Sequence, residues 1–160
     1  MSWFVRNLRD MQWWTRPGRG SLTAFVGDDE QVCVNLFVLG PGESMSMYHW
    51  EADQEGFLVL AGEAVLIVED EEHPLRQWDY FHKPAGVSHT IIGAGDGPSA
   101  ILALGAREHQ HGPDWGGYTV DEAALRHDAG VEEETTEPKQ AYARFTKRKP
   151  TRYREGWLPK

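Results

Sequence analysis

Short apolar stretches separated by turn residues dominate the middle of the chain. Clusters such as Gly40-Pro41-Gly42 and Pro84-Ala85-Gly86 mark turns, and the segments between them have the length and composition of strands. The pattern predicts strands at residues 22–26, 31–39, 45–51, 56–60, 64–69, 73–76, 80–83, 88–92 and 100–106. Many short strands at this spacing indicate an all-β protein, either a sandwich or a closed barrel.

The two ends of the chain depart from this pattern. Residues 1–20 mix tryptophan with arginine and end in a Pro-Gly break, which predicts an arm that packs across a sheet or a partner subunit. Residues 121–127 fit one short helix that begins near Asp121 or Thr119. Beyond residue 130, an acidic and then a basic run is typical of a solvated tail, whereas interspersed aromatic residues indicate partial docking on the barrel. We therefore expect an arm (1–20), a barrel (21–108) and a C-terminal extension (109–160) with a short helix and a charged tail.

Composition and charge narrow the class of protein. A chain of 160 residues suits one domain, and the single cysteine, Cys33, allows no intrachain disulfide and is expected to be a buried structural thiol. No apolar stretch reaches the roughly 18 residues that cross a bilayer, and the first residues lack a signal-peptide pattern, so we expect a cytoplasmic protein without a membrane partner. Of the net charge of −9, residues 1–138 carry −16 and the rest +7. The acidic body argues against a nucleic-acid partner, and RNA or anionic lipid at the basic end is a minor alternative.

Four side chains are candidates for metal binding. Strand side chains alternate, so His49 and Glu51 share a face with two methionines. Glu55 opens the next strand and can reach back toward His49, and His89 follows the rigid Pro84-Ala85-Gly86 corner. Each has a simpler explanation when taken singly, namely a hydrogen-bonded strand histidine or a turn carboxylate facing water. The same alternation predicts an apolar and aromatic pocket lining of Met45, Met47, Phe57, Val59 and Ile91, with Tyr80 and His82 on a neighbouring strand.

Taken together, these residues resemble the two sequence motifs of the cupin superfamily, of the single-domain conserved-barrel type. The first motif corresponds to Gly42, His49, Glu51, Glu55 and Gly62, and the second to Pro84, Gly86 and His89. The chain departs from the motifs at three positions, where Glu51 replaces a histidine, Trp78 a glycine and Gly93 an asparagine. The resemblance implies a double-stranded β-helix, a jelly-roll barrel with a metal at its mouth. It carries the ligand roles over to His49, Glu55 and His89, with Glu51 at the remaining position.

A glutamate in place of a histidine changes the charge of the implied site. Two carboxylates and two neutral imidazoles cancel one divalent ion, and Fe, Mn, Zn and Ni all remain candidates. If Glu51 turns away, the other three ligands form a two-histidine, one-carboxylate triad with open positions. His82 is a candidate for an acid–base role beside the metal, or else an outward-facing surface histidine. A second histidine pair, His109 and His111, is expected to be exposed in a loop.

Three functions fit the sequence. The first is a metal-dependent enzyme for a small molecule, of the oxygenase, isomerase or lyase type. The second is a non-catalytic cupin that binds a small molecule or a metal, and the third is a regulatory module whose charged tail contacts a partner. The resemblance also implies a homodimer, to which the tryptophan-rich arm is suited. The residues do not specify a substrate.

Overall fold

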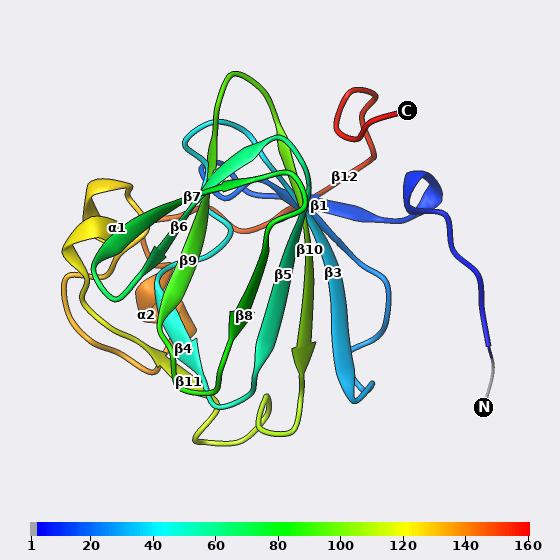
Figure 1. The fold of residues 1–160 in the computed structure, drawn as a ribbon. Helices are drawn as coiled ribbons and strands as arrows, with labels where there is room; N and C mark the ends of the chain where they lie inside the picture. Colours follow the sequence, from blue (N-terminus) through cyan, green and yellow to red (C-terminus); the bar gives the residue numbers. More distant parts are fainter. Residues whose placement is uncertain (1–2) are drawn as a thin grey trace.

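Two antiparallel sheets packed face to face make up the barrel (Figure 1). This computed structural model describes residues 3–160, so residues 1 and 2 of the expected arm lie outside the described part. The larger sheet has the order β12-β1-β2-β3-β10-β5-β8, and the smaller one the order β11-β4-β9-β6-β7. The strands of the larger sheet are β1 (Trp13–Thr15), β2 (Ser21–Ala24), β3 (Val32–Leu39), β5 (Glu55–Ala61), β8 (Tyr80–Lys83), β10 (Ser99–Ala106) and β12 (Lys149–Thr151). Those of the smaller sheet are β4 (His49–Glu51), β6 (Glu63–Val68), β7 (Glu71–Arg76), β9 (His89–Ala94) and β11 (Gly116–Tyr118). This is the predicted all-β jelly roll, with a short 3-10 helix η1 (Leu8–Asp10) and two short helices, α1 (Glu122–Arg126) and α2 (Pro138–Ala141).

The main core lies between the two sheets. Alternation along each strand turns one set of side chains inward, and these sets meet in one apolar cluster. The members buried most deeply are Leu39, Phe57, Val59, Ala64, Ile91 and Ile101. The core thus fills one end of the barrel with apolar side chains.

The strand predicted at residues 45–51 is much shorter than expected, because β4 begins only at His49. Residues 45–48 are irregular: the Met45 N–H donates to the Ile91 carbonyl, whereas the Tyr48 N–H donates to Ala129 in the C-terminal extension. Met47 is therefore buried with Tyr118 outside the main core. The other predicted strands occur within a few residues of their expected bounds.

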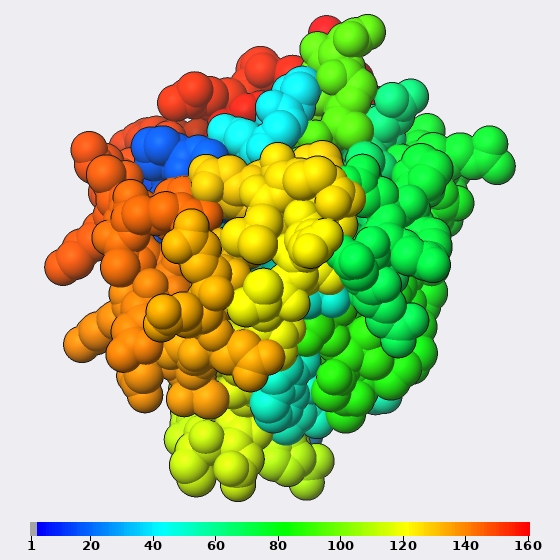
Figure 2. Space-filling view, turned by 90° about the vertical axis from the view of Figure 1, so that its left-hand side faces the viewer, coloured from blue at the N-terminus to red at the C-terminus, as the bar shows by residue number. Residues whose placement is uncertain are grey.

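The C-terminal extension packs on the barrel rather than forming a solvated tail. Strand β12 pairs with β1, and the buried Trp13 ring packs against Tyr153 and Trp157 at centroid distances of 6.2 and 4.9 Å. Figure 2 shows the extension, coloured yellow to red, spread over one face of the molecule. Aromatic contacts thus hold this segment against the barrel.

Helix α1 covers the outer face of the smaller sheet. The Asp121 carboxylate accepts a hydrogen bond from the Ala124 N–H at 2.8 Å, which caps the helix as the sequence indicated. Tyr48 is buried beneath this helix, with Ala123 and Ala124. Within residues 3–160, no helix has the length and apolar character needed to cross a membrane.

Candidate metal centre

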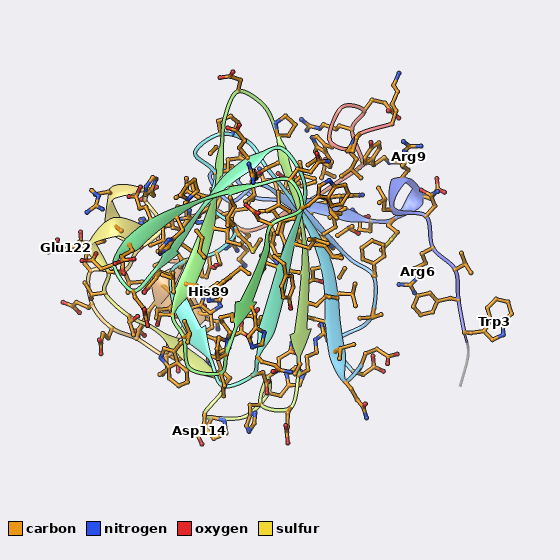
Figure 3. The ribbon with its side chains drawn as sticks, viewed as in Figure 1. Trp3, Arg6, Arg9, His89, Asp114 and Glu122 are labelled. Carbon is orange, nitrogen blue, oxygen red and sulfur yellow. The ribbon has the colours of Figure 1, made fainter. Side chains whose placement is uncertain are left out.

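Four predicted ligand residues meet at the inner end of a cavity of about 290 Å³ that opens at one end of the barrel. Strands β4 and β9 pair so that His49 is the register partner of His89, and β5 contributes Glu55 from the facing sheet. His89 projects between the two sheets (Figure 3). His49, Glu51, Glu55 and His89 all line this cavity.

Both imidazoles have the same orientation. Nδ1 of His49 lies 2.7 Å from the Met47 carbonyl oxygen, and Nδ1 of His89 lies 3.4 Å from the Val87 carbonyl oxygen. A carbonyl only accepts, so Nδ1 is the donor, and the neutral ring keeps its lone pair on Nε2. Nε2 of His49 lies 3.1 Å from Oε1 of Glu51, and Nε2 of His89 lies 3.5 Å from Oε2 of Glu55. Each lone pair thus faces a carboxylate, an arrangement that favours a cation shared between them.

Lys83 is a buried neighbour of the candidate ligands that the sequence reasoning missed. Its side chain is completely buried, and Nζ donates hydrogen bonds to the carbonyl oxygens of Asp53, at 2.7 Å, and Glu51, at 3.3 Å. Nζ also lies 3.3 Å from Oε2 of Glu55. That oxygen is buried and within ion-pair distance of the ammonium, but it accepts no hydrogen bond of good geometry among the described residues. Its unused lone pair makes it a candidate metal ligand.

Burial and charge set the protonation of the site. Burial and the negative charge of Glu51 raise the pKa of Glu55 to about 7, against the opposing charges of His49 and Lys83. Burial lowers the pKa of His49, but the hydrogen bond and charge of Glu51 outweigh it and leave that pKa raised. The pKa of His89 falls well below its ordinary value because the ring is buried and faces the charges of His49 and Lys83. His89 is therefore neutral at pH 7, the form that binds metal.

Three of the four candidate ligand residues place their ligand atoms close to one another. One ligand atom from each of His49, Glu51 and Glu55 falls within a group whose members are all within 4.8 Å of one another, and the Glu55–His89 contact extends it. Imidazole and carboxylate together suit Fe, Mn, Ni and Zn.

Comparison with known proteins gives the family. Residues 35–105 match the family model for the cupin domain. This part of the chain is a cupin domain. No curated protein matches the sequence.

Solved structures agree with this assignment. A sugar phosphate isomerase of the cupin superfamily from Silicibacter pomeroyi is 29% identical, with a TM-score of 0.51 over 62% of each chain. A predicted oxalate decarboxylase from Thermotoga maritima is 18% identical, with a TM-score of 0.58 over 64% of this chain and 98% of its own, and this likeness shows the fold. The alignment thus spans under two thirds of the Silicibacter protein.

Two departures from the cupin motifs can be seen in the local backbone. Trp78 stands where the motif has glycine and adopts a φ of 76°, in the left-handed region that favours glycine. Gly93 stands where the motif has asparagine, and a Cβ there would lie 2.2 Å from the Gly40 carbonyl oxygen. The first departure places a side chain in a strained turn, and the second is required by close backbone contact.

His82 is exposed and does not line the cavity with the four candidate ligands. The β8 strand alternates so that Phe81 and Lys83 turn inward, while Tyr80 and His82 are exposed. The buried position next to Glu55 is thus filled by Lys83, and His82 has no contact through which to transfer a proton there. Residues 80–83 mix polar and apolar side chains, so the sequence did not show which face of this strand is buried.

The lining of the cavity is also partly different from the prediction. Met45 and Phe57 line it, whereas Met47, Val59 and Ile91 belong to the packed interior. Cys33, expected to be a buried structural thiol, is half-buried and lines the cavity, and burial raises its pKa. Sequence reasoning missed the outer lining residues Arg107, Gln110, Trp115, Tyr118, Tyr142 and Arg148.

Both histidines of the second pair are exposed in the loop, as expected. Nδ1 of His109 nevertheless lies 2.7 Å from Oδ1 of the buried Asp53, and the His109 backbone N–H donates to Oδ2 at 2.8 Å. These two bonds fasten the loop of residues 107–115 to the cupin barrel. Figure 3 shows Asp114 of this loop at the open end of the barrel.

Proposed function

We propose that the cupin domain holds one divalent metal ion through His49, Glu51, Glu55 and His89 and acts with it on a small molecule in the adjoining cavity. One observation carries the proposal: both imidazoles donate Nδ1–H to a carbonyl and direct Nε2 at a carboxylate oxygen. Metal-binding histidines commonly have their other ring nitrogen held in this way.

The reaction class that we favour is isomerisation, with a lyase or oxygenase reaction as the other classes consistent with the fold. Support comes from the Silicibacter protein, named as a sugar phosphate isomerase. A bound metal would supply Lewis acidity toward a carbonyl or enediolate oxygen. Isomerisation also requires a group that moves a proton between neighbouring carbons.

Two protein groups are suited to proton transfer and hydrogen bonding. The Glu51 side chain is 31% exposed toward the cavity, so it can reach a substrate proton if it is not fully committed to the metal. Tyr118 lines the same cavity, and burial raises the pKa of its phenol, which keeps the hydroxyl protonated as a donor. Phe37, Met45 and Phe57 provide an apolar wall that limits the entry of water.

A second candidate is a cupin that binds a small molecule without a metal. The observation in its favour is the buried ammonium of Lys83, which already provides a positive charge 3.3 Å from Glu55. A cytoplasmic homodimer remains a prediction in either case, and the exposed Trp3, Phe4 and Val5 are available to a second copy.

The isomerase proposal is tested by proton exchange. Sugar phosphates are incubated in D₂O with the metal-loaded protein, the chelated protein and a His89→Ala variant, and NMR follows deuterium entry beside the carbonyl. We expect exchange with the loaded parent alone. A loaded parent that exchanges no substrate proton would contradict the isomerase assignment and favour the other classes.

A further inference from the structure

The outer wall of the cavity is built by segments that lie outside the matched cupin residues 35–105. The loop of residues 107–115 contributes Gln110 and Trp115, and the C-terminal extension contributes Tyr142 and Arg148. The Tyr142 hydroxyl oxygen accepts a hydrogen bond from the Met47 backbone N–H at 3.0 Å, which joins the extension to the barrel. The cavity is therefore completed by segments outside the matched cupin residues.

Arg148 is a cation without a protein partner. It lines the cavity, and within residues 3–160 no carboxylate forms an ion pair with it and no group accepts a hydrogen bond from its side chain. The other cavity arginine, Arg107, differs because its guanidinium contacts the Gly27 carbonyl and lies 3.6 Å from an Asp28 oxygen. Arg148 thus has its donors free for a ligand.

A second arginine, Arg16, adds to the positive charge around Tyr142. The Arg16 guanidinium lies 4.9 Å from the centre of the Tyr142 ring, and its buried Nε has no hydrogen-bond partner in the described part of the chain. Arg148 is exposed at the rim of the cavity, where partial desolvation lowers the pKa of its guanidinium and the charge of Arg16 lowers it further, against an opposing effect of Tyr142. Two neighbouring cations that lack a carboxylate are stabilised when an anion binds between them.

The inner end of the cavity does not itself attract an anion. Two glutamates cancel the charge of a divalent ion, so the four ligands and the metal are neutral together. The body of the chain is strongly acidic. The ammonium of Lys83 is 3.3 Å from Glu55 but does not line the cavity, so the cationic side chains that line it are Arg107 and Arg148. Within residues 3–160, only Arg148 of these two lacks a protein partner.

We propose that Arg148, with Arg16 beside it, binds a carboxylate or phosphate group on the small molecule that enters the cavity. A volume of about 290 Å³ is at the lower end of ligand pockets, which indicates a molecule of few carbon atoms. The molecule spans from the arginine end toward the four metal ligands. That it is the substrate rests on the proposed function, whereas anion binding itself needs no metal.

The test is calorimetric titration of chelated and metal-loaded full-length protein with inorganic phosphate, with succinate and with uncharged glycerol. We expect one of the two anions to bind in both forms and glycerol to bind in neither. Arg148→Gln should weaken the anion's affinity by about tenfold or more, because charge-assisted hydrogen bonds are lost, and Arg148→Lys should weaken it less. Arg152→Gln, an exposed arginine of the same segment that does not line the cavity, is the matched control and should bind as the parent does.

Each outcome has one meaning. Equal affinity in the parent and Arg148→Gln, an equal loss in Arg152→Gln, or a parent that binds neither anion would overturn the anion site. Phosphate binding without succinate binding identifies a phosphate group, and the reverse identifies a carboxylate. Metal content measured on the same samples separates the two proposals. If the parent binds the anion but takes up no metal, the anion site is supported and the proposed metal-dependent function is contradicted.

Discussion

His49 and His89 are register partners across the antiparallel pair of β4 and β9, with ring centroids 5.3 Å apart. The two residues are distant in the sequence, and the pairing brings them onto the same inner face of the sheet. Because both rings are also held by backbone carbonyls, their Nε2 atoms are fixed before any ion binds. Such preorganisation of ligands on strands is what a metal site requires.

Lys83 is expected to contribute strongly to stability. A Lys83→Met variant keeps most of the side-chain volume but leaves two buried carbonyls and Glu55 without their cation. We expect it to lower the free energy of unfolding by about 3 kcal/mol in urea denaturation of the metal-free protein. The exposed Lys147→Met variant should change it by no more than about 0.5 kcal/mol. Similar values for both variants would show that the buried ammonium is unimportant for folding.

Replacing Trp78 by glycine is expected to stabilise the turn in which it lies. Its side chain is 66% exposed and its φ is 76°, so the ring gives little burial while the backbone is strained. Trp78→Gly should be more stable than Trp78→Ala by about 1 kcal/mol, since only alanine keeps the Cβ that opposes this conformation. Thermal unfolding of both variants measures the difference. A Trp78→Ala protein as stable as the glycine variant would mean that the turn relaxes.

The loop of residues 107–115 is expected to loosen as the pH rises. The hydrogen bond and charge of Asp53 raise the pKa of His109, so the ion pair is complete below the ordinary histidine pKa and is lost as the pH rises through the raised value. Hydrogen exchange of the loop amides should therefore gain a step of faster opening as the pH rises through the raised pKa of His109, beyond the usual base catalysis. His109→Gln should lack this step. A parent and a variant with the same pH profile would disprove the role of this ion pair.

The barrel could be predicted because its information is local. Turn residues and alternation gave the strands, and the motif spacing gave His49, Glu55 and His89 as one group. Glu51 was placed correctly on the cavity by alternation alone, although its role as a ligand stays a prediction.

The remaining features depend on contacts between distant segments. Lys83 was missed because four residues of mixed polarity do not show which face of β8 is buried. The position of Arg148 depends on the pairing of β12 with β1 and on Trp157 packing against Trp13, and no pattern within residues 139–160 specifies those partners. The cavity wall therefore could not be derived from the motifs.

The most direct test of the metal site is the metal content of protein purified without an affinity tag or added metal, measured by elemental mass spectrometry. The parent and a His82→Ala control, altered at an exposed residue of β8, should each carry about one equivalent of Fe, Mn, Ni or Zn. A His89→Ala variant should carry little, because it loses a buried ligand. Parent protein that holds no metal even after reconstitution, or a His89→Ala variant that holds as much as the parent, would contradict the account.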